Sequence, residues 1–399
     1  MHPNAGRPCK ILYLSYDGLT DPLGQSQILP YLCALSSTYS ITIISFEKRN
    51  RFTSTKQSIE IICSSKNMIW IPLIYHKTPP IFSTLYDLFK LKKKVKERHL
   101  KHSYDIIHCR SYITSLVGLW MKRNHNVKFI FDMRGFWADE RVDGKIWKLG
   151  NPLFTKIYKF FKKKEKQFLM ESDHIISLTQ NAKSEIISWG LPNAPIAVIP
   201  TCVDLNLFDP DKIKPELALQ AKMNLGIQQN DFIILYLGSW GTWYMTTEML
   251  KFFEKVKHQK KNAKFLILTE DTVDLENFAF KKDVIVQKSA RHNIPLYISL
   301  AKVAVFFIKP SFSKKASSAT KMGELMAMNI LIVTNKGWGD VEKIVSDTEV
   351  IFENEFWKLN SDQIPPINTR SYCRQNMSLE IGVSLYSGVY TKVLNRSNY

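Results

Sequence analysis

Apolar residues along this chain gather in short unbroken runs, and segments with a helical period separate the runs. The first two runs are KILYLSY (10–16) and YSITIISFE (39–47), with the helix-like segment ILPYLCALSS (28–37) between them. Unbroken apolar runs are typical of strands buried on both faces of a parallel sheet. Because a strand, a helix and a strand follow one another, the pattern predicts a βαβ unit at the start of the chain.

The same alternation continues and then starts again after a polar, turn-rich segment at 205–230. We expect further strands at 104–110, 127–135, 173–179, 196–204, 231–239, 263–270, 283–290, 303–311 and 330–337. We expect further helices at 113–124, 151–172, 180–190, 246–258, 292–302 and 321–329. At 399 residues the chain is also too long for one ordinary core. The sequence therefore predicts an α/β fold of two Rossmann-like domains that face each other across a cleft. Their expected ranges are 1–204 and 205–370, and a C-terminal helix at 371–399 is expected to pack back on the first domain.

Ligands of open parallel sheets bind beyond the carboxyl ends of the strands, which singles out a small set of loops. These loops are 17–27, 108–112, 132–143, 238–244, 309–321 and 335–340. In the loops of the first domain, the residues expected to line the cleft are Asp17, Gln25, His108 and Arg110. His108 also fits a buried, structurally satisfied imidazole. Gly24 would let the backbone approach a phosphate ahead of a helix that starts near Ser26, although a plain strand–helix turn is the alternative.

The stretch SSATKMGELMAM (317–328) places a lysine and a glutamate at the start of an apolar helix. Thr320 can cap this helix, and Glu324 in the first turns is favoured by the helix dipole. Lys321 opposes that dipole, so a structural role alone leaves it unexplained. An anionic group bound between Lys321 and the helix start removes the conflict, while Glu324 accepts hydrogen bonds from vicinal hydroxyls. A nucleotide with a ribose and a diphosphate has both features.

The charge and the cysteine content indicate the kind of partner and the cellular compartment. The formal net charge of +19 indicates an anionic partner, and the six scattered cysteines favour a reducing compartment without a zinc site or disulfides. No apolar run is long enough to span a membrane. The basic runs at 88–102 and 156–168 predict either a solvated helix face or adsorption to an anionic leaflet, with Tyr158, Phe160 and Phe161 entering the interface. We therefore expect a cytoplasmic protein, peripheral at the inner face of the membrane, and no nucleic-acid partner.

Several segments resemble bacterial family 4 glycosyltransferases of the GT-B fold. They are YDGLTDPLGQSQILPYL, DMRGFWADERVDG, VIPTCVDLNLFDP, LYLGSWGTWYM and FIKPSFSKKASSATKMGELMA followed by GWGDVE, within about residues 10–350. The resemblance implies a second domain that binds a nucleotide-sugar donor and a first domain that receives a glycan or lipid-linked acceptor. It also implies transfer with retention of anomeric configuration, in surface polysaccharide biosynthesis, with no metal and no cofactor.

The resemblance can be carried over position by position. Glu324 matches the second Glu of the family's Glu–seven residues–Glu signature, which holds the ribose, whereas the first position is Ala316. Ser239, after Gly238, stands where the family often has an Arg that grips the diphosphate. The phosphate charge must then be met by Lys321, with Arg291, Lys309 and Lys314 as further candidates, beside Thr320. Arg134 or Asp132 takes the place of the family's histidine, so the catalytic candidates are Arg134, Asp132 and Lys321.

The sequence is also consistent with other functions. Ala316 and Ser239 favour a catalytically silent subunit that binds nucleotide or a partner protein. An enzyme with other chemistry on the same architecture, such as a nucleotide-sugar epimerase, is a further alternative. A basic nucleic-acid binder is the weakest, because no recognised RNA- or DNA-binding module is present.

Overall fold

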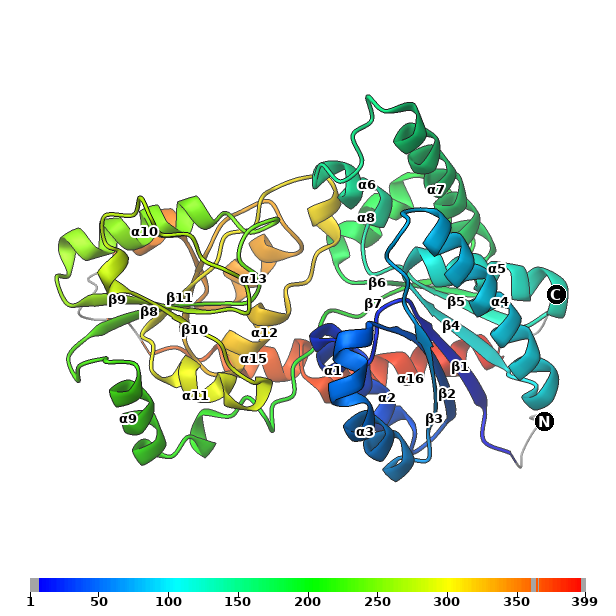
Figure 1. The fold of residues 1–399 in the computed structure, drawn as a ribbon, viewed down its shortest axis with the longest axis horizontal. Coiled ribbons are helices and arrows are strands. Elements are labelled where there is room, and N and C mark those ends of the chain that lie inside the picture. Colours follow the sequence, from blue (N-terminus) through cyan, green and yellow to red (C-terminus); the bar gives the residue numbers. More distant parts are fainter. Residues whose placement is uncertain (1–6, 360–363, 365, 396–399) are drawn as a thin grey trace. The chain divides into compact units, whose positions relative to one another are not determined.

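The structure is a computed structural model that describes residues 7–359, 364 and 366–395. The chain divides into two compact units, and each is built around its own sheet (Figure 1). Unit 1 comprises residues 1–200 and 382–399, and unit 2 comprises residues 201–381. The first division thus falls between Pro200 and Thr201, a few residues before the expected boundary. The expected tail is divided too, because its residues up to Ile381 belong to unit 2.

The sheet of unit 1 has seven parallel strands in the order β3-β2-β1-β4-β5-β6-β7. The strands are β1 (Lys10–Ser15), β2 (Ser40–Glu47), β3 (Ile69–Ile74), β4 (Ile106–Arg110), β5 (Lys128–Asp132), β6 (His174–Ser177) and β7 (Ile196–Val198). In register, Leu12 of β1 lies between Thr42 of β2 and Ile107 of β4. The strand order reverses between β1 and β4, which is the switch point where such sheets bind ligands. β3 was missed by the sequence pattern, because this edge strand is only partly buried and contains Pro72.

Helices connect the strands of unit 1. They are α1 (Pro22–Gln27), α2 (Leu29–Leu35), α3 (Arg49–Ser65), α4 (Phe82–His102), α5 (Ser111–His125), α6 (Trp137–Asp143), α7 (Pro152–Glu171) and α8 (Gln180–Ser188), with α16 (Leu379–Asn395) from Gly382 onward. α3 was not predicted, because it buries Ile59 and Cys63 and otherwise carries few apolar residues in a helical period. α4 contains the basic run at 88–102, and α7 contains the run at 156–168.

Two neighbouring residues of β4 show which helices cover each face of the unit 1 sheet. His108 and Cys109 point to opposite faces, since successive strand side chains alternate. A Cβ at Gly118 of α5 would lie 2.5 Å from the Cys109 sulfur, so α5 packs closely on that face. His108 contacts Tyr386 and Tyr390 of α16, which therefore covers the other face.

The membrane role expected for α7 is wrong for two of its three aromatic residues. Phe161 is buried against Trp137, and Tyr158 donates a hydrogen bond to Asp139 at 2.8 Å. These two rings face the protein because α6 packs along α7. Phe160 is the member of the three that is exposed. Within the described part of the chain, none of the helices combines the length and the apolar character needed to cross a membrane.

Unit 2 repeats the same plan with six parallel strands in the order β10-β9-β8-β11-β12-β13. The strands are β8 (Phe232–Leu237), β9 (Ala263–Leu268), β10 (Val284–Gln287), β11 (Val303–Val305), β12 (Leu331–Thr334) and β13 (Ile351–Phe352). The helices are α9 (Pro215–Asn224), α10 (Thr246–Gln259), α11 (Ile294–Ser299), α12 (Thr320–Ala327), α13 (Val341–Asp347), α14 (Glu353–Phe356) and α15 (Thr369–Asn376). α9 lies within the segment expected to be a polar linker. The order again reverses between two central strands, here β8 and β11, so this unit has its own switch point.

Candidate functional site

The loops that follow β8 and β11 are joined at the switch point of unit 2. Gly238 follows β8 with a φ of +112°, a conformation that favours glycine. The Met245 N–H donates to the Phe307 carbonyl, and the Lys309 N–H donates to the Trp243 carbonyl, both at 2.9 Å. The two loops therefore form one connected platform at the carboxyl edge of the sheet.

Lys321, in the first turn of α12, extends into this platform. The residue is 5% exposed, and its Nζ lies 3.6 Å from the ring centre of Tyr244 and 4.2 Å from that of Tyr236. Its Nζ also donates a hydrogen bond to the Tyr236 hydroxyl at 3.1 Å. A Cβ at Gly238 would lie 2.8 Å from this Nζ, so the missing side chain leaves the room that the amine occupies. The lysine thus ends where a parallel sheet binds its ligands.

The surroundings of Lys321 make its charge depend on a ligand. Burial lowers the pKa of Lys321 well below its usual value of 10.5, and the nearby Glu324 carboxylate opposes this shift. The ring faces of Tyr236 and Tyr244 attract a cation, but they carry no full negative charge. An anionic oxygen placed beside Nζ would favour the protonated amine. The site is therefore suited to bind an anion together with a proton.

The lowered pKa of Lys321 predicts how stability depends on pH. From the folded-state pKa up to 10.5, the unfolded chain binds a proton that the folded chain lacks, so the contribution of Lys321 to the free energy of unfolding rises with pH. We expect Lys321→Met to be more stable than the wild type at neutral pH, with a difference that shrinks as the pH approaches 10.5. Urea unfolding of both proteins across this range measures it. A difference that does not change with pH would show that the amine is protonated throughout.

Glu324 forms a buried ion pair one turn further along α12. Its Oε1 accepts a hydrogen bond from Arg291 Nη1 at 2.7 Å, and its side chain is 5% exposed against 33% for Arg291. The Arg291 guanidinium also lies 5.3 Å from the ring centre of Phe208. In this structure Arg291 thus holds the carboxylate that we expect to bind the ribose.

The remaining donor-side candidates of unit 2 differ in exposure. Lys314 is buried, with its Nζ 3.7 Å from the ring centre of Trp243. Lys309 and Ser239 are exposed on the joined loops, and the Ser239 carbonyl accepts a hydrogen bond from the Tyr236 hydroxyl. Lys314 and Lys321 therefore both contact aromatic rings of the loop that follows β8.

The expected cap of α12 is wrong. The N-cap position is Ala319, which has extended backbone angles, and no side chain caps the helix. Thr320 is the first helical residue, one position too far along the chain to act as the cap. Ala316, at the position of the missing Glu, is buried in a short 3-10 turn at Ser313–Ala316.

In unit 1, Gly24 has a packing role that the sequence did not reveal. A Cβ at Gly24 would lie 2.0 Å from the Gly18 carbonyl oxygen, which no side chain can accommodate. The helix expected near Ser26 instead begins at Pro22 and has six residues. The side chain of Gln25 donates to the Thr20 carbonyl at 3.2 Å and so braces the same loop.

Glu47, at the end of β2, holds this loop in place and was missed by the sequence analysis. The residue is 0% exposed, and its carboxylate accepts four hydrogen bonds. The donors are the Leu19 and Thr20 N–H groups and the hydroxyls of Thr20 and Ser45, at 2.5–3.0 Å. A Cβ at Gly18 would lie 2.5 Å from Glu47 Oε2, so the glycine permits this approach. The loop after β1 is therefore fixed by a buried carboxylate.

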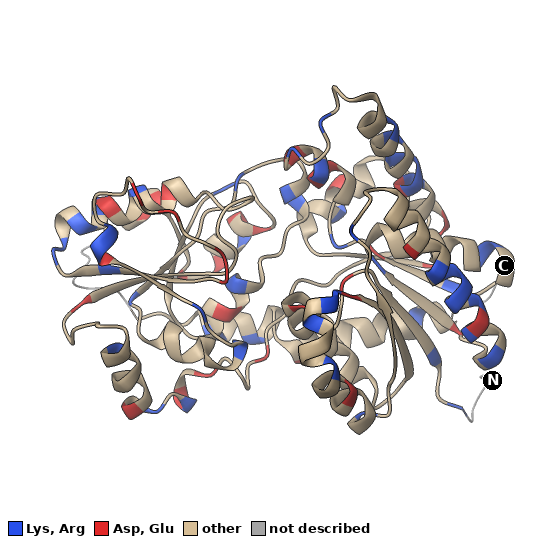
Figure 2. Ribbon diagram, in the orientation of Figure 1, with Lys and Arg blue, Asp and Glu red and all other residues tan. Residues whose placement is uncertain are grey.

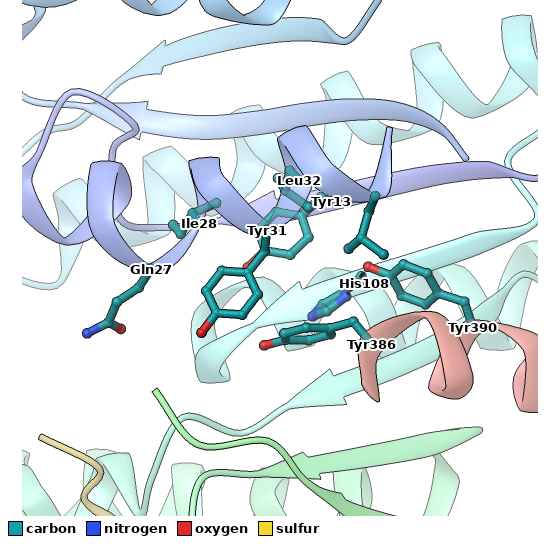
Figure 3. A pocket seen from close by; sticks show the side chains of 9 residues that line it. Tyr13, Gln27, Ile28, Tyr31, Leu32, His108, Tyr386 and Tyr390 are labelled. Atoms are coloured by element: carbon teal, nitrogen blue, oxygen red, sulfur yellow. Dashed lines mark hydrogen bonds between the residues drawn. The ribbon is translucent and has the colours of Figure 1, made fainter. Parts of the chain in front are cut away.

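His108 lies at the centre of a small pocket of unit 1 that Figure 3 shows. One ring nitrogen, Nδ1, lies 2.8 Å from the Tyr390 hydroxyl, and Nε2 lies 3.3 Å from Asp132 Oδ2. The Tyr386 hydroxyl donates to the same Asp132 oxygen at 3.3 Å. Burial lowers the pKa of His108 although Asp132 opposes the shift, so His108 is a neutral, fully partnered residue.

Arg110 and Arg134 follow two neighbouring strands, β4 and β5, and meet at Gln27. Each donates from Nη2 to Gln27 Oε1 at 2.9 Å, and Arg110 Nε also lies 3.3 Å from Asp17 Oδ2. Burial acts to raise the pKa of Asp132, but Arg134, His108 and Arg110 outweigh it and hold that pKa below its usual range. Asp132 is therefore a buried carboxylate that keeps its charge beside two guanidinium groups.

The structure thus brings the candidates together in two groups, one in each unit. Asp17, His108, Arg110, Asp132 and Arg134 gather in unit 1, and Gly238, Arg291, Lys321 and Glu324 gather in unit 2. Sequence analysis missed the side chains that complete them, namely Gln27, Glu47, Tyr236, Tyr244, Tyr386 and Tyr390. For Tyr386 and Tyr390, the i, i+4 spacing in the sequence could have indicated that both lie on one face of a helix. The described residues contain no group of three His, Cys, Asp or Glu side chains that could hold a metal ion, and the six cysteines, all of them described, form no disulfide bond.

The chain is similar to known glycosyltransferases in part of its sequence and in its fold. The profile of Glycosyltransferase Family 4 matches residues 37–207. No protein of curated function matches the sequence. A glycosyltransferase from Rickettsia africae aligns with 98% of this chain and 100% of its own, at a TM-score of 0.72 and 16% identity.

Other solved structures share the fold at similarly low identity. Sucrose-phosphate synthase from Thermosynechococcus elongatus aligns with 98% of this chain and 100% of its own, at a TM-score of 0.72 and 13% identity. Anabaena HepE in complex with UDP aligns with 96% of this chain and 99% of its own, at a TM-score of 0.70 and 12% identity. Both units, each with a parallel sheet and flanking helices, therefore have counterparts in GT-B glycosyltransferases. Residues 37–207 of this chain thus match Glycosyltransferase Family 4, and the fold of the chain is that of GT-B glycosyltransferases.

Proposed function

We propose that this glycosyltransferase transfers a sugar from a nucleotide-sugar donor to a glycan or lipid-linked acceptor, with retention of anomeric configuration, in surface polysaccharide biosynthesis. Unit 2 binds the donor and unit 1 receives the acceptor. The observation that carries the proposal is the position of Lys321 against Gly238, at the carboxyl end of β8, with Glu324 one turn away. These groups match the diphosphate and the ribose of a nucleotide.

The proposed chemistry fits the residues that the chain has. In a retaining transfer of this type the leaving diphosphate takes the acceptor proton on the same face, so no protein nucleophile is required. The enzyme must align the reactants and stabilise the departing negative charge. Lys321 supplies a cation in a water-poor aromatic setting, where an electrostatic interaction is stronger than in water. Ala316 and Ser239, which lack the charge that the family has at their positions, are compatible with this division of roles.

The structural relatives support the nature of the donor and of the product. Anabaena HepE is described in complexes with UDP and with UDP-glucose. WaaB, with a TM-score of 0.61, is described as a lipopolysaccharide outer core galactosyltransferase. A nucleotide-sugar donor and a role in surface polysaccharide are therefore the first hypotheses to test for this chain.

We propose that α4 places unit 1 on an anionic membrane face. Four of its exposed apolar residues, Phe82, Leu85, Tyr86 and Phe89, follow the i, i+3, i+4, i+7 spacing of one helix face. Basic residues crowd the following turns, as the blue segments of α4 in Figure 2 show. Each lysine near an anionic leaflet contributes about 1 kcal/mol of binding free energy. Such a surface would bring the enzyme close to a lipid-linked acceptor.

A thermal-shift screen tests the donor assignment. We expect one of UDP, GDP, ADP or TDP, or a sugar conjugate of it, to raise the melting temperature, because a ligand that binds only the folded state stabilises it. The shift is expected to disappear in Glu324→Ala and in Lys321→Met. A shift that both variants retain would place the nucleotide elsewhere. Absence of a shift with all four would remove the donor assignment.

A second candidate function is a catalytically silent subunit that binds nucleotide. Ala316 and Ser239 favour it, because both stand where the family carries a charged residue. Nucleotide binding without transfer across a broad panel of donors and acceptors would support this function. Incubation with the donor alone, followed by product analysis, would reveal an epimerase.

A further inference from the structure

Gln27 of unit 1 bridges two positive charges with one neutral oxygen. The Nη2 atoms of Arg110 and Arg134 both donate to Gln27 Oε1, each at 2.9 Å. Arg110 ends β4, Arg134 follows β5, and Gln27 ends α1, which itself follows β1. Because β1 and β4 flank the switch point of this sheet, the three side chains meet where a parallel sheet binds its ligands.

This cluster leaves hydrogen-bonding groups without partners. Arg110 is 3% exposed, yet its Nη1 has no hydrogen-bond partner, and neither has the Nε of Arg134. Unpartnered buried donors are uncommon and cost free energy, most of all on a charged group. Arg134 also has a φ of +56°, which is uncommon for a residue with a long side chain. The cluster therefore has donor capacity that the folded chain does not use.

The neighbouring carboxylates of Asp17 and Asp132 explain only in part why the two arginines lie here. Asp17 Oδ2 lies 3.3 Å from Arg110 Nε, and this carboxylate is half exposed. Asp132 Oδ1 lies 3.9 Å from Arg134 Nη1, too far for a hydrogen bond, and has no hydrogen-bond partner itself. Neither pair has the two parallel hydrogen bonds that make arginine–carboxylate pairs strong. The carboxylates thus compensate the charge without using the two guanidinium forks.

We propose that Arg110 and Arg134 bind a phosphoryl group, and that Gln27 swings aside to admit it. A phosphoryl group offers several acceptor oxygens and about two negative charges, which suits two donor-only guanidinium groups. In the absence of ligand, the Gln27 carboxamide oxygen takes the place of one phosphate oxygen. Gln27 and Arg134 are both partly exposed, with 11% of the Arg134 side chain accessible, so the site reaches the surface of unit 1 on this side. This assignment rests on the proposed function: the bound group belongs to the acceptor, which is either a sugar phosphate or a phosphorylated lipid carrier.

The test is titration calorimetry with inorganic phosphate on the full chain. We expect saturable binding that weakens about tenfold or more in Arg134→Gln, because one charged donor fork is lost. Gln27→Glu places a carboxylate of the protein between the two guanidinium groups, so it should abolish phosphate binding without lowering the melting temperature. The control is Arg123→Gln, since Arg123 is an exposed residue of α5 paired with Glu171, and it should bind phosphate like the wild type.

Lys321→Met separates this site from the donor site of unit 2. Phosphate binding that Lys321→Met retains and Arg134→Gln loses supports the proposal, and the reverse result overturns it. Unchanged binding in Gln27→Glu also overturns it. The nucleotide screen of unit 2 is independent, because a failed nucleotide shift with intact phosphate binding refutes the donor assignment and leaves this site standing.

Two further titrations identify the source of the phosphoryl group. Glucose 6-phosphate represents a sugar phosphate, and phosphatidylcholine vesicles with a small fraction of polyprenyl phosphate represent a lipid carrier, with plain phosphatidylcholine vesicles as reference. The preferred probe should depend on Arg134 as inorganic phosphate does. Equal binding of both probes to Arg134→Gln and to the wild type would contradict an acceptor-binding role.

Discussion

Lys321→Met is expected to lower kcat/KM for sugar transfer about 100-fold or more, because one preorganised charge at the developing leaving-group anion is lost. Methionine has a similar length and suits the aromatic surroundings, in which Nζ lies 3.6 Å from the Tyr244 ring centre. Steady-state kinetics with the donor found in the thermal-shift screen measure the effect. Glu324→Ala is expected to act mainly through a raised KM for the donor, because its proposed contact with the ribose is the same in the ground and transition states.

Lys257→Met is the matched control, because Lys257 is a second buried lysine of unit 2. Its Nζ donates to the Ala263 carbonyl at 3.1 Å and pairs with Asp283 at 3.0 Å, at the start of β9 and thus at the opposite edge of the sheet. We expect Lys257→Met to lower stability and to leave kcat/KM close to the wild-type value. Equal losses of activity in both lysine variants would show that Lys321 acts through folding alone.

Glu47→Ala is expected to lower the free energy of unfolding of unit 1 by about 3–5 kcal/mol, because several buried donors lose their shared acceptor and remain unsatisfied. Glu47 is 0% exposed and accepts four hydrogen bonds from Leu19, Thr20 and Ser45. Urea unfolding followed by circular dichroism measures the loss. The loop of residues 17–27 should also become more sensitive to limited proteolysis, since its first residues are held by this carboxylate.

Glu60→Ala provides the comparison for a glutamate that lacks such a network. Glu60 is half exposed on α3 and lies 3.6 Å from Lys56, so its replacement should change stability by less than about 0.5 kcal/mol. A Glu47→Ala protein that unfolds within about 1 kcal/mol of the wild type would mean that the loop donors find other partners.

Much of the fold could be predicted because buried parallel strands must be apolar at nearly every position. The runs at 10–16, 39–47, 231–239 and 263–270 all contain strands of the structure, and the two-sheet α/β architecture is confirmed. The pattern failed where burial is partial. β3 lies at the edge of its sheet, and α3 buries few residues, so neither shows the apolar pattern of a fully buried strand or an amphipathic helix.

The candidate residues could be predicted less completely than the fold. Motif positions identified Lys321, Glu324 and Arg134, but not their partners. Tyr236, which accepts the Lys321 hydrogen bond, is 85 residues away in sequence, and Gln27 is 107 residues away from Arg134. No local spacing indicates such a contact. The cap expected at Thr320 was wrong because the helix starts one residue earlier than its sequence suggests.

The repeating strand–helix order, the two parallel sheets and the loops at their carboxyl edges can be read from the sequence, because they follow from local polarity and chain direction. Three contacts become visible only in the folded chain: tyrosines enclose Lys321, Arg291 pairs with Glu324, and two arginines share Gln27. The reason is physical: burial and electrostatic coupling depend on which side chains the fold brings within a few ångströms of each other, and those side chains come from distant segments of the chain.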